Sequence, residues 1–215
     1  MRPRVLAHRG DRVAGPENSL RAVCAAFAAS DGAEVDVLVT ADGHAVLRHD
    51  ERLEDGTPVR ALSLAEARRA LGADSDDLPL VSDVLRRVGS GGGTLDLELK
   101  VPGALRALLA IGPLPTSVVF TSFHASEVVD ARRHAPHLRV GLLIEGRLPR
   151  FVPVGTSFLA VEHGLLPIAR AALPGAALWA FTIDGPGAIA RASAAGCEVW
   201  IADDVAAARG AIGTD

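Results

Sequence analysis

Residues 118–145 read VVFTSFHASEVVDARRHAPHLRVGLLIE, and this stretch shows the pattern that decides the fold. An apolar run, Val118–Ser122, is followed after a short break by a segment of helical length, Ala125–His134, and then by a second apolar run, Val140–Glu145. A strand, a helix and a strand in this order are typical of a parallel β-sheet whose neighbouring strands are connected by helices.

The same alternation extends along the chain in both directions. Asn18 is predicted as the N-cap of the helix Ser19–Ala29, and Ser63 with Glu66 forms a capping-box pattern at the start of Ser63–Leu71. Further helices are predicted at Leu80–Val88, Gly103–Leu109, Pro167–Leu173, Gly187–Ala195 and Val205–Ala211, and further strands at Val5–His8, Ala33–Val39, Ala45–His49, Leu95–Leu99, Phe158–Glu162, Ala177–Ile183 and Val199–Ala202. Eight such units close into a barrel that typically has ~250 residues. The pattern therefore predicts an α/β protein, a single compact TIM-type (β/α)8 barrel domain over residues 1–215 with short loops.

There are nine predicted strands for eight places in the barrel. Thr40-Ala41-Asp42-Gly43 is a turn that leaves no room for a helix between the strands Ala33–Val39 and Ala45–His49. The two strands form either an antiparallel hairpin or two parallel barrel strands joined by extended chain. In the hairpin, pairing Thr40 with Gly43 would place Glu34 opposite His49.

Composition excludes several classes of protein. The chain is 49% hydrophobic and 22% charged, which is ordinary for a soluble globular protein, and its net charge of −4 argues against a nucleic-acid partner. No run of apolar residues is long enough for a membrane span or a signal peptide. Cys24 and Cys197 are interpreted as small hydrophobic residues rather than a disulfide, which favours a cytoplasmic location. The glycine tract Ser90–Gly93 opens no helix, so it is interpreted as a connection and not as a phosphate-binding loop.

Charged side chains stand at strand positions where a core residue is expected. His8-Arg9 ends the first strand, and His49-Asp50 ends the third. Glu34 and Asp36 share one face of the second strand because side chains alternate with a period of two, and Asp96, Glu98 and Lys100 share one face of the fourth. Burying unpaired charge in a core is costly. One explanation is that these acids form ion pairs with Arg9 and Lys100 inside the barrel. The other is that they belong to an active site, because the ends of parallel barrel strands assemble active sites, and we favour this explanation.

The residue types at these positions suggest phosphodiester chemistry. Three carboxylates without a nearby cysteine form a hard-oxygen site, which suits Mg²⁺ or Ca²⁺. Such a cation can neutralise a phosphate group, and two histidines can act as acid and base near neutral pH. Arg9 and Lys100 could hold the non-bridging phosphoryl oxygens.

The ordered motifs resemble those of glycerophosphodiester phosphodiesterases over nearly the whole chain. They are His8-Arg9-Gly10, Pro16-Glu17-Asn18-Ser19, Glu34-Val35-Asp36-Val37, Thr40-Ala41-Asp42-Gly43, His49-Asp50, Glu98-Leu99-Lys100, Thr121-Ser122-Phe123, Phe181-Thr182-Ile183-Asp184 and Ile201-Ala202-Asp203. The resemblance implies a TIM-type barrel and hydrolysis of glycerophosphodiesters to glycerol 3-phosphate and an alcohol. It implies His8 and His49 as the acid–base pair, Glu34, Asp36 and Glu98 as metal ligands, Arg9 and Lys100 as phosphate contacts, and Glu17 and Asn18 as residues that shape the site, Glu17 by orienting Arg9.

The chain also departs from the family pattern. The segment Glu51–Leu78 is short where family members carry a longer capping insertion, and Phe181 stands where the family usually has Trp. Asp184 and Ala202 likewise replace the usual Asn and Thr. A trimmed cap would leave the pocket mouth open, which suggests longer, lipid-like substrates as an alternative.

Three functions are therefore compared. The first is a metal-dependent glycerophosphodiesterase, the second a lysophospholipid phosphodiesterase that releases a cyclic phosphate, and the third a catalytically silent barrel that binds phosphodiesters or a protein. The retained acid–base pair and the three carboxylates argue against the third. His124 and Glu162 end later strands, and the end-of-strand rule predicts that they contact the substrate. The expected partner is a small phosphodiester or a lysophospholipid, and the sequence gives no indication of oligomeric state.

Overall fold

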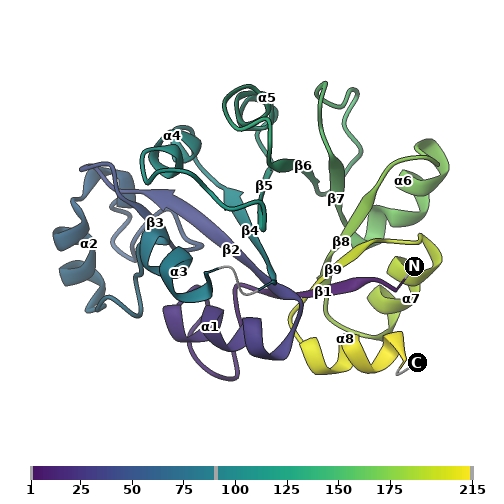
Figure 1. The fold of residues 1–215 in the computed structure, drawn as a ribbon, viewed down its shortest axis with the longest axis horizontal. Helices are drawn as coiled ribbons and strands as arrows, with labels where there is room; N and C mark the ends of the chain where they lie inside the picture. Colours follow the sequence, from purple (N-terminus) through teal and green to yellow (C-terminus); the bar gives the residue numbers. More distant parts are fainter. Residues whose placement is uncertain (1, 90–91, 214–215) are drawn as a thin grey trace.

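The computed structural model describes residues 2–89 and 92–213, and its centre is a closed barrel of eight parallel strands (Figure 1). The strands follow one another around the barrel in chain order, and the barrel closes because β1 pairs with both β2 and β9. Their bounds are β1 Arg4–His8, β2 Gly32–Val39, β4 Thr94–Leu99, β5 Val118–Ser122, β6 Arg139–Ile144, β7 Phe158–Glu162, β8 Leu178–Ile183 and β9 Val199–Ala202. The prediction of a TIM-type barrel is confirmed.

The extra strand, β3 (Ala45–Leu47), pairs antiparallel with β2 outside the barrel, so the hairpin alternative is correct. Its predicted register is wrong by one residue, because the Thr40 amide donates to the His44 carbonyl and Val39 pairs with Ala45. The Thr40 hydroxyl stabilises the longer loop by accepting from the His44 amide at 3.1 Å. In this register Glu34 does not lie opposite His49, which follows the end of β3.

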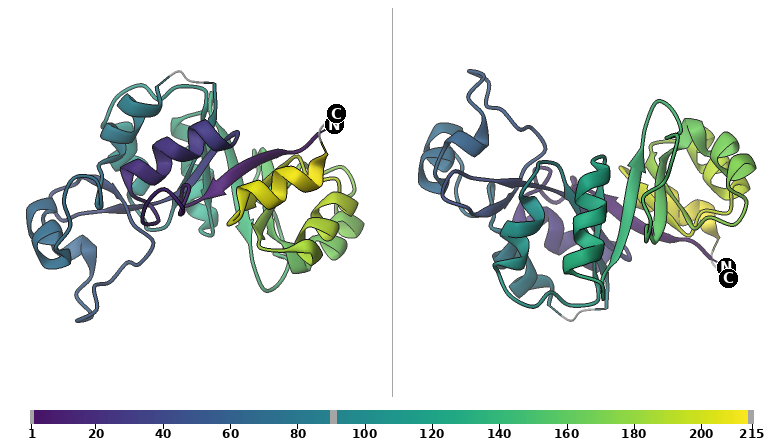
Figure 2. Two further views of the ribbon diagram at one scale, coloured as in Figure 1. Left: turned by 90° about the horizontal axis from the view of Figure 1, so that it is seen from below. Right: turned by 90° about the horizontal axis from the view of Figure 1, so that it is seen from above.

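Helices cover the outer face of the barrel (Figures 1 and 2). They are α1 Leu20–Ala29, α2 Leu64–Leu71, α3 Val81–Val88, α4 Ala104–Leu109, α5 Ala125–His134, α6 Leu166–Ala172, α7 Pro186–Ala194 and α8 Val205–Ile212, with short 3-10 turns η1 Val59–Ala61 and η2 His163–Leu165. The capping box of Ser63 and Glu66 is present. Ser19, and not Asn18, caps α1 by accepting from the Ala22 amide. Residues 145–157, all of them described, connect β6 to β7 without a helix.

The segment between β3 and α3 is the short capping insertion. It contains only η1 and α2 as regular elements and projects from one side of the barrel, at the left of Figures 1 and 2. The pocket described below is lined by barrel strands and their following loops, and no residue of this insertion beyond His49 lines it. The cap is therefore trimmed, as the sequence predicts. Residues 90 and 91 of the predicted glycine connection lie outside the described residues.

Aromatic side chains fill the interior of the barrel at the end where the strands begin. Phe158 and Trp179 stack with ring centroids 3.8 Å apart, and the Arg139 guanidinium lies 5.2 Å from the Phe158 centroid. Leu6, which is fully buried, packs in the same cluster. Trp179 and Trp200 are both buried, as predicted for core residues. Because this end of the barrel interior is filled, the pocket described below opens at the carboxyl-terminal end of the strands.

Gly32, at the start of β2, is a position where only glycine fits. Its φ of +141° is disfavoured for other residues, and a Cβ atom there would overlap the Thr94 carbonyl group of the neighbouring strand. We expect Gly32→Ala to destabilise the protein by roughly 1–3 kcal/mol, measured by urea unfolding. Gly43→Ala is the matched control, since Gly43 also has positive φ but a Cβ atom at that position would have no neighbour within 4 Å. Equal losses for both variants would contradict the steric explanation.

Two further sequence expectations concern compartment and membrane. Within residues 2–89 and 92–213, we find no helix with the length and apolarity that a bilayer crossing requires. Cys24 and Cys197 are both free thiols. Burial raises the pKa of the Cys197 thiol to about 12, so this cysteine behaves as a core residue, as expected from the sequence.

Candidate active site

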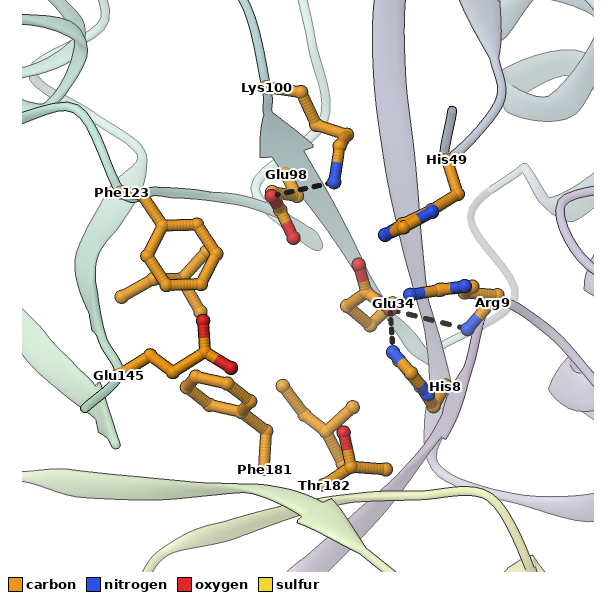
Figure 3. A pocket seen from close by; sticks show the side chains of 12 residues that line it. His8, Arg9, Glu34, His49, Glu98, Lys100, Phe123, Glu145, Phe181 and Thr182 are labelled. Carbon is orange, nitrogen blue, oxygen red and sulfur yellow. Dashed lines mark hydrogen bonds and ion pairs between the residues drawn. The ribbon is translucent and has the colours of Figure 1, made fainter. Parts of the chain in front are cut away.

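A pocket opens at the carboxyl-terminal end of the barrel, where the first four predicted strands bring their charged residues together (Figure 3). It is lined by His8, Arg9, Glu34, His49, Glu98, Lys100, Phe123, Leu143, Glu145, Phe181, Thr182 and Ile201. The two imidazoles therefore lie at the same end of the barrel. One side of the pocket is charged and comes from β1 to β4, whereas the other side is largely apolar and comes from β5 to β9.

Three carboxylates form a compact cluster on the charged side. Glu34 and Asp36 alternate with buried valines on β2, and Asp36 pairs in register with Glu98 on β4. One oxygen from each of the three lies within 4.8 Å of the others. All three side chains are buried, and the Oε1 atom of Glu34 has no hydrogen-bond partner. This set of hard oxygen atoms, one of them without a partner, fits a divalent cation.

The carboxylates raise one another's proton affinity. Burial raises the pKa of Glu34 well above its ordinary value, and repulsion from Asp36 and Glu98 raises it further. Burial also raises the pKa of Glu98, against the opposing effect of Lys100. Asp96, one layer deeper in the barrel, accepts from the Thr121 hydroxyl at 2.9 Å, and burial raises its pKa as well. A bound cation would relieve this repulsion.

Lys100 and Arg9 place two positive charges beside the cluster. The Lys100 Nζ atom lies 3.1 Å from Asp36 and 3.4 Å from Glu98. Burial alone would lower the pKa of Lys100, but these carboxylates outweigh it and the pKa is raised, so the ammonium keeps its charge. The Arg9 Nε atom lies 3.2 Å from Asp36, at ion-pair distance but without hydrogen-bond geometry.

Glu17 and Asn18 support this arrangement from the loop after β1. Glu17 accepts from the Arg9 guanidinium with both oxygens at 3.1 Å, so it orients Arg9 as the sequence predicts. Asn18 is buried with a φ of +59°, and its side chain makes two bonds with Asp36. Its amide donates to the Asp36 carboxylate at 2.8 Å, and its oxygen accepts from the Asp36 backbone at 3.0 Å. Asn18 therefore fixes the orientation of Asp36.

Each histidine is paired with a carboxylate through its Nδ1 atom. His8 Nδ1 lies 2.7 Å from Asp203, at the end of β9, and His49 Nδ1 lies 2.8 Å from Asp50. The bond from His8 lowers the pKa of Asp203, and the bond from His49 lowers that of Asp50. Both carboxylates therefore stay ionised and hold the Nδ1 proton, which leaves Nε2 of each imidazole for other partners. The His8 Nε2 atom lies 3.9 Å from Glu34.

Two predicted substrate contacts lie beside the pocket rather than in its lining. The His124 ring nitrogen Nε2 is 3.1 Å from the Lys100 carbonyl, and Glu162 accepts from the Gly146 amide at 2.9 Å. These bonds tie neighbouring loops together. The structure thus brings nine of the predicted residues to the carboxylate cluster or its immediate surroundings, and places His124 and Glu162 outside it.

Several lining residues were given no site role from the sequence. They are Phe123, Leu143, Glu145, Phe181, Thr182 and Ile201. The end-of-strand rule directs Glu145, which follows β6, toward this mouth of the barrel, and the same rule could have identified Phe123, which follows β5. Asp203 was recognised only as part of a motif, and its pairing with His8 follows from the closure of β9 onto β1.

The chain is similar to known proteins in sequence and in fold. The model of the glycerophosphoryl diester phosphodiesterase family matches residues 8–108. A glycerophosphodiester phosphodiesterase from Caldanaerobacter subterraneus subsp. tengcongensis is 31% identical over 67% of this chain and 68% of its own. A Mycobacterium tuberculosis protein named "Probable glycerophosphodiester phosphodiesterase 1" is 31% identical over 85% of this chain and 82% of its own. The structure of an Oleispira antarctica phosphodiesterase in complex with the product sn-glycerol-3-phosphate is similar in fold, with a TM-score of 0.80, 22% identity, and coverage of 99% of this chain and 97% of that one.

Proposed function

This chain belongs to the glycerophosphoryl diester phosphodiesterase family and is thus a phosphoric diester hydrolase, and we propose that it hydrolyses glycerophosphodiesters to glycerol 3-phosphate and an alcohol in a metal-dependent reaction. The observation that carries the proposal is one pocket lined by two carboxylate-paired histidines and by Glu34 and Glu98, which cluster with the buried Asp36. The Oleispira antarctica relative of the same fold binds sn-glycerol-3-phosphate, the product proposed for this chain.

Glu34, Asp36 and Glu98 would hold the metal ion, and their oxygen atoms favour Mg²⁺ or Ca²⁺. When bound, the ion supplies positive charge that offsets the charge of the phosphate group. Asn18 keeps the Asp36 carboxylate in place for this role, because it bonds to both the side chain and the backbone of Asp36. Mutual repulsion of the ligands disfavours their full ionisation without a cation.

Arg9 and Lys100 would bind the non-bridging phosphoryl oxygens. Both side chains line the pocket next to the carboxylates, and both remain protonated. The two bonds from Glu17 restrict the Arg9 guanidinium to one orientation, which favours a fixed contact with a phosphate oxygen. The substrate phosphorus would then lie between this cationic edge and the two histidines.

His8 and His49 would exchange protons with the substrate. One imidazole Nε2 accepts the proton of the attacking hydroxyl while the new oxygen–phosphorus bond forms. The other donates a proton to the oxygen of the leaving alcohol as its bond to phosphorus breaks. The attacking hydroxyl belongs either to water or to the substrate's own glycerol. In the second case a cyclic phosphate forms, and water opens it with the two histidines in exchanged roles: the one that lost its proton accepts a proton from water, and the other returns its proton to the glycerol oxygen. Asp203 and Asp50 hold each ring so that Nε2 faces the substrate.

The direct test is the release of glycerol 3-phosphate from purified protein and glycerophosphocholine, with Mg²⁺ or Ca²⁺ added to EDTA-treated enzyme. Activity that appears only with metal supports the proposal. Absence of hydrolysis with either ion, together with tight binding of the diester, would instead support the catalytically silent barrel.

Asp203 is predicted to act as a positioning residue for His8. We expect Asp203→Asn to lower kcat by between about 10-fold and 10⁴-fold with little change in KM, because the ring can then adopt the wrong tautomer. One limb of the pH–rate profile, acidic or basic, should shift in this variant. Loss of a purely structural contact would leave both limbs where they are. Asp204→Asn, at the neighbouring N-cap of α8, is the control for loss of a carboxylate in this loop. An unchanged pH profile and kcat for Asp203→Asn would contradict the role.

A lysophospholipid phosphodiesterase is the second candidate, because a groove lined by apolar side chains together with Glu145, Arg147 and Arg150 continues from the pocket. The groove shares Phe123, Leu143 and Glu145 with the pocket and extends along the helix-free connection after β6 to Phe151, whose side chain is 73% exposed. An acyl chain could lie there. Turnover of lysophosphatidylcholine above that of glycerophosphocholine, with a cyclic phosphate product, would favour this candidate.

The proposal also includes a cytoplasmic location and a small-molecule partner. The free thiols of Cys24 and Cys197 suit a reducing compartment. The net charge of −4 provides no general attraction for nucleic acid, so the local cations Arg9 and Lys100 are assigned to phosphate binding alone.

A further inference from the structure

The side of the pocket that faces the carboxylate cluster contains two aromatic rings and one acid. Phe123 follows β5, Phe181 lies in β8, and their ring centroids are 6.1 Å apart with an angle of 82° between the planes. Glu145 follows β6, and in Figure 3 its carboxylate points between the two rings. We call these three residues the aromatic wall. It presents two aromatic rings and a negative charge on the side of the pocket where the rest of a bound phosphodiester would lie.

Glu145 differs from the acids on the opposite side of the pocket in having no cationic partner. Glu98 is paired with Lys100, and Glu34 lies 3.9 Å from the His8 ring nitrogen Nε2. For Glu145, by contrast, no side-chain nitrogen of Lys, Arg or His in residues 2–89 and 92–213 lies within 4.0 Å of its carboxylate. An unpaired carboxylate beside two ring faces is a favourable environment for an organic cation. The charge in this wall is therefore available to a ligand.

We infer that the aromatic wall binds the ammonium group of the leaving alcohol, so that the enzyme prefers phosphodiesters of choline or ethanolamine. This inference rests on the proposed function and specifies its substrate class. The negative ring faces and Glu145 attract the positive nitrogen, while Arg9 and Lys100 attract the phosphate on the other side. A zwitterionic diester, with its phosphate and ammonium joined by a short linker, matches this separation of charge across one pocket.

The arginines nearby provide the opposing argument. Arg147 and Arg150 line the adjoining groove and would attract a carboxylate on the leaving alcohol, such as the one that distinguishes a serine ester from an ethanolamine ester. Neither of them lines the pocket that contains both rings, whereas Glu145 lines both the pocket and the groove. The part of the leaving alcohol next to the phosphate group therefore contacts Glu145 and the two rings before it could reach Arg147 or Arg150. This arrangement favours an alcohol that carries a positive charge.

The test compares kcat/KM for four soluble diesters with one metal: glycerophosphocholine, glycerophosphoethanolamine, glycerophosphoglycerol and glycerophosphoserine. For Glu145→Gln we expect the ratio of kcat/KM between the choline ester and the glycerol ester to fall about 3- to 30-fold. Phe123→Leu, which removes one ring face from a 43% exposed position, should lower the same ratio. Glu54→Gln, an exposed acid outside the pocket, is the matched control and should leave the ratio unchanged.

The outcomes separate this inference from the proposed function. If no diester is hydrolysed, the proposed function fails. If all four are hydrolysed with similar kcat/KM, or if Glu145→Gln leaves the ratio as it is, only the cation-binding wall is overturned. A preference for the serine ester over the ethanolamine ester, which lacks only the carboxylate, would assign the site to an anion. Lysophosphatidylcholine carries the same headgroup as glycerophosphocholine. An equal effect of Glu145→Gln on both would show that the headgroup is recognised whether it comes from a soluble diester or from a lipid.

Discussion

Replacing His49 or His8 with alanine is expected to lower kcat for glycerophosphocholine by about 10²–10⁴-fold, the contribution that a positioned general acid or base usually makes. Each imidazole lines the pocket with Nε2 free, while Nδ1 is bound to Asp50 or Asp203. The rate of glycerol 3-phosphate release at saturating metal and substrate measures the effect. The wild-type pH–rate profile should be bell-shaped, and each variant should lose one of its two limbs.

The double variant adds a second criterion. Because the two histidines act in the same step, the loss in His8→Ala/His49→Ala should be little larger than that of the more damaging single change. His137→Ala, an exposed histidine at the far end of α5, is the control and should retain full activity. Wild-type rates in either single variant, with a normal thermal unfolding curve, would exclude that histidine from the chemistry.

The fold could be predicted from the sequence because its signals are local. Each barrel strand is an apolar run flanked by turn residues, and the observed ends lie within two residues of the predicted ones. The register of the β2–β3 hairpin could not be predicted, since it depends on bonds between the Thr40 hydroxyl and the His44 backbone. The N-cap of α1 was predicted one residue early for a different reason. The Asn18 side chain has the chemistry of a cap, but it is bound to Asp36 on another element.

The charged side of the pocket was also predictable, because its residues interrupt strands that would otherwise be apolar. Glu34, Asp36 and Glu98 stand out against the valines and leucines around them, and parallel strands place them together. The opposite side gave no such signal. Phe123 and Phe181 stand out in the sequence only as parts of motifs, Leu143 is an ordinary strand residue, and barrel closure brings all three to face the carboxylates. The composition of this side of the pocket is therefore visible only in three dimensions.

The second large effect is expected from the metal site. Removing one ligand charge with Glu34→Gln or Glu98→Gln should weaken Mg²⁺ or Ca²⁺ binding and reduce turnover to background, while the fold is retained. For the wild type, metal at about 100 times its dissociation constant should stabilise the protein by about 2.7 kcal/mol and raise the melting temperature by roughly 5–10 °C. Calorimetric titration and thermal unfolding with and without EDTA measure both quantities.

In the metal-free protein, Glu34→Gln should no longer be unfavourable, because ionised Glu34 then lowers the free energy of unfolding. The pKa of Glu34 is raised in the folded protein by burial and by the neighbouring carboxylates, so its ionisation costs more free energy there than in the unfolded chain. Stability of the metal-free wild type should therefore fall as the pH rises from the ordinary carboxyl pKa of 4.5 through the raised one. Glu34→Gln removes this penalty and should be at least as stable as the wild type near neutral pH in EDTA. Glu54→Gln, exposed and outside the cluster, should follow the wild type in metal and in EDTA. A Glu34→Gln variant that still gained stability from metal to the full extent would show that the ion is bound elsewhere.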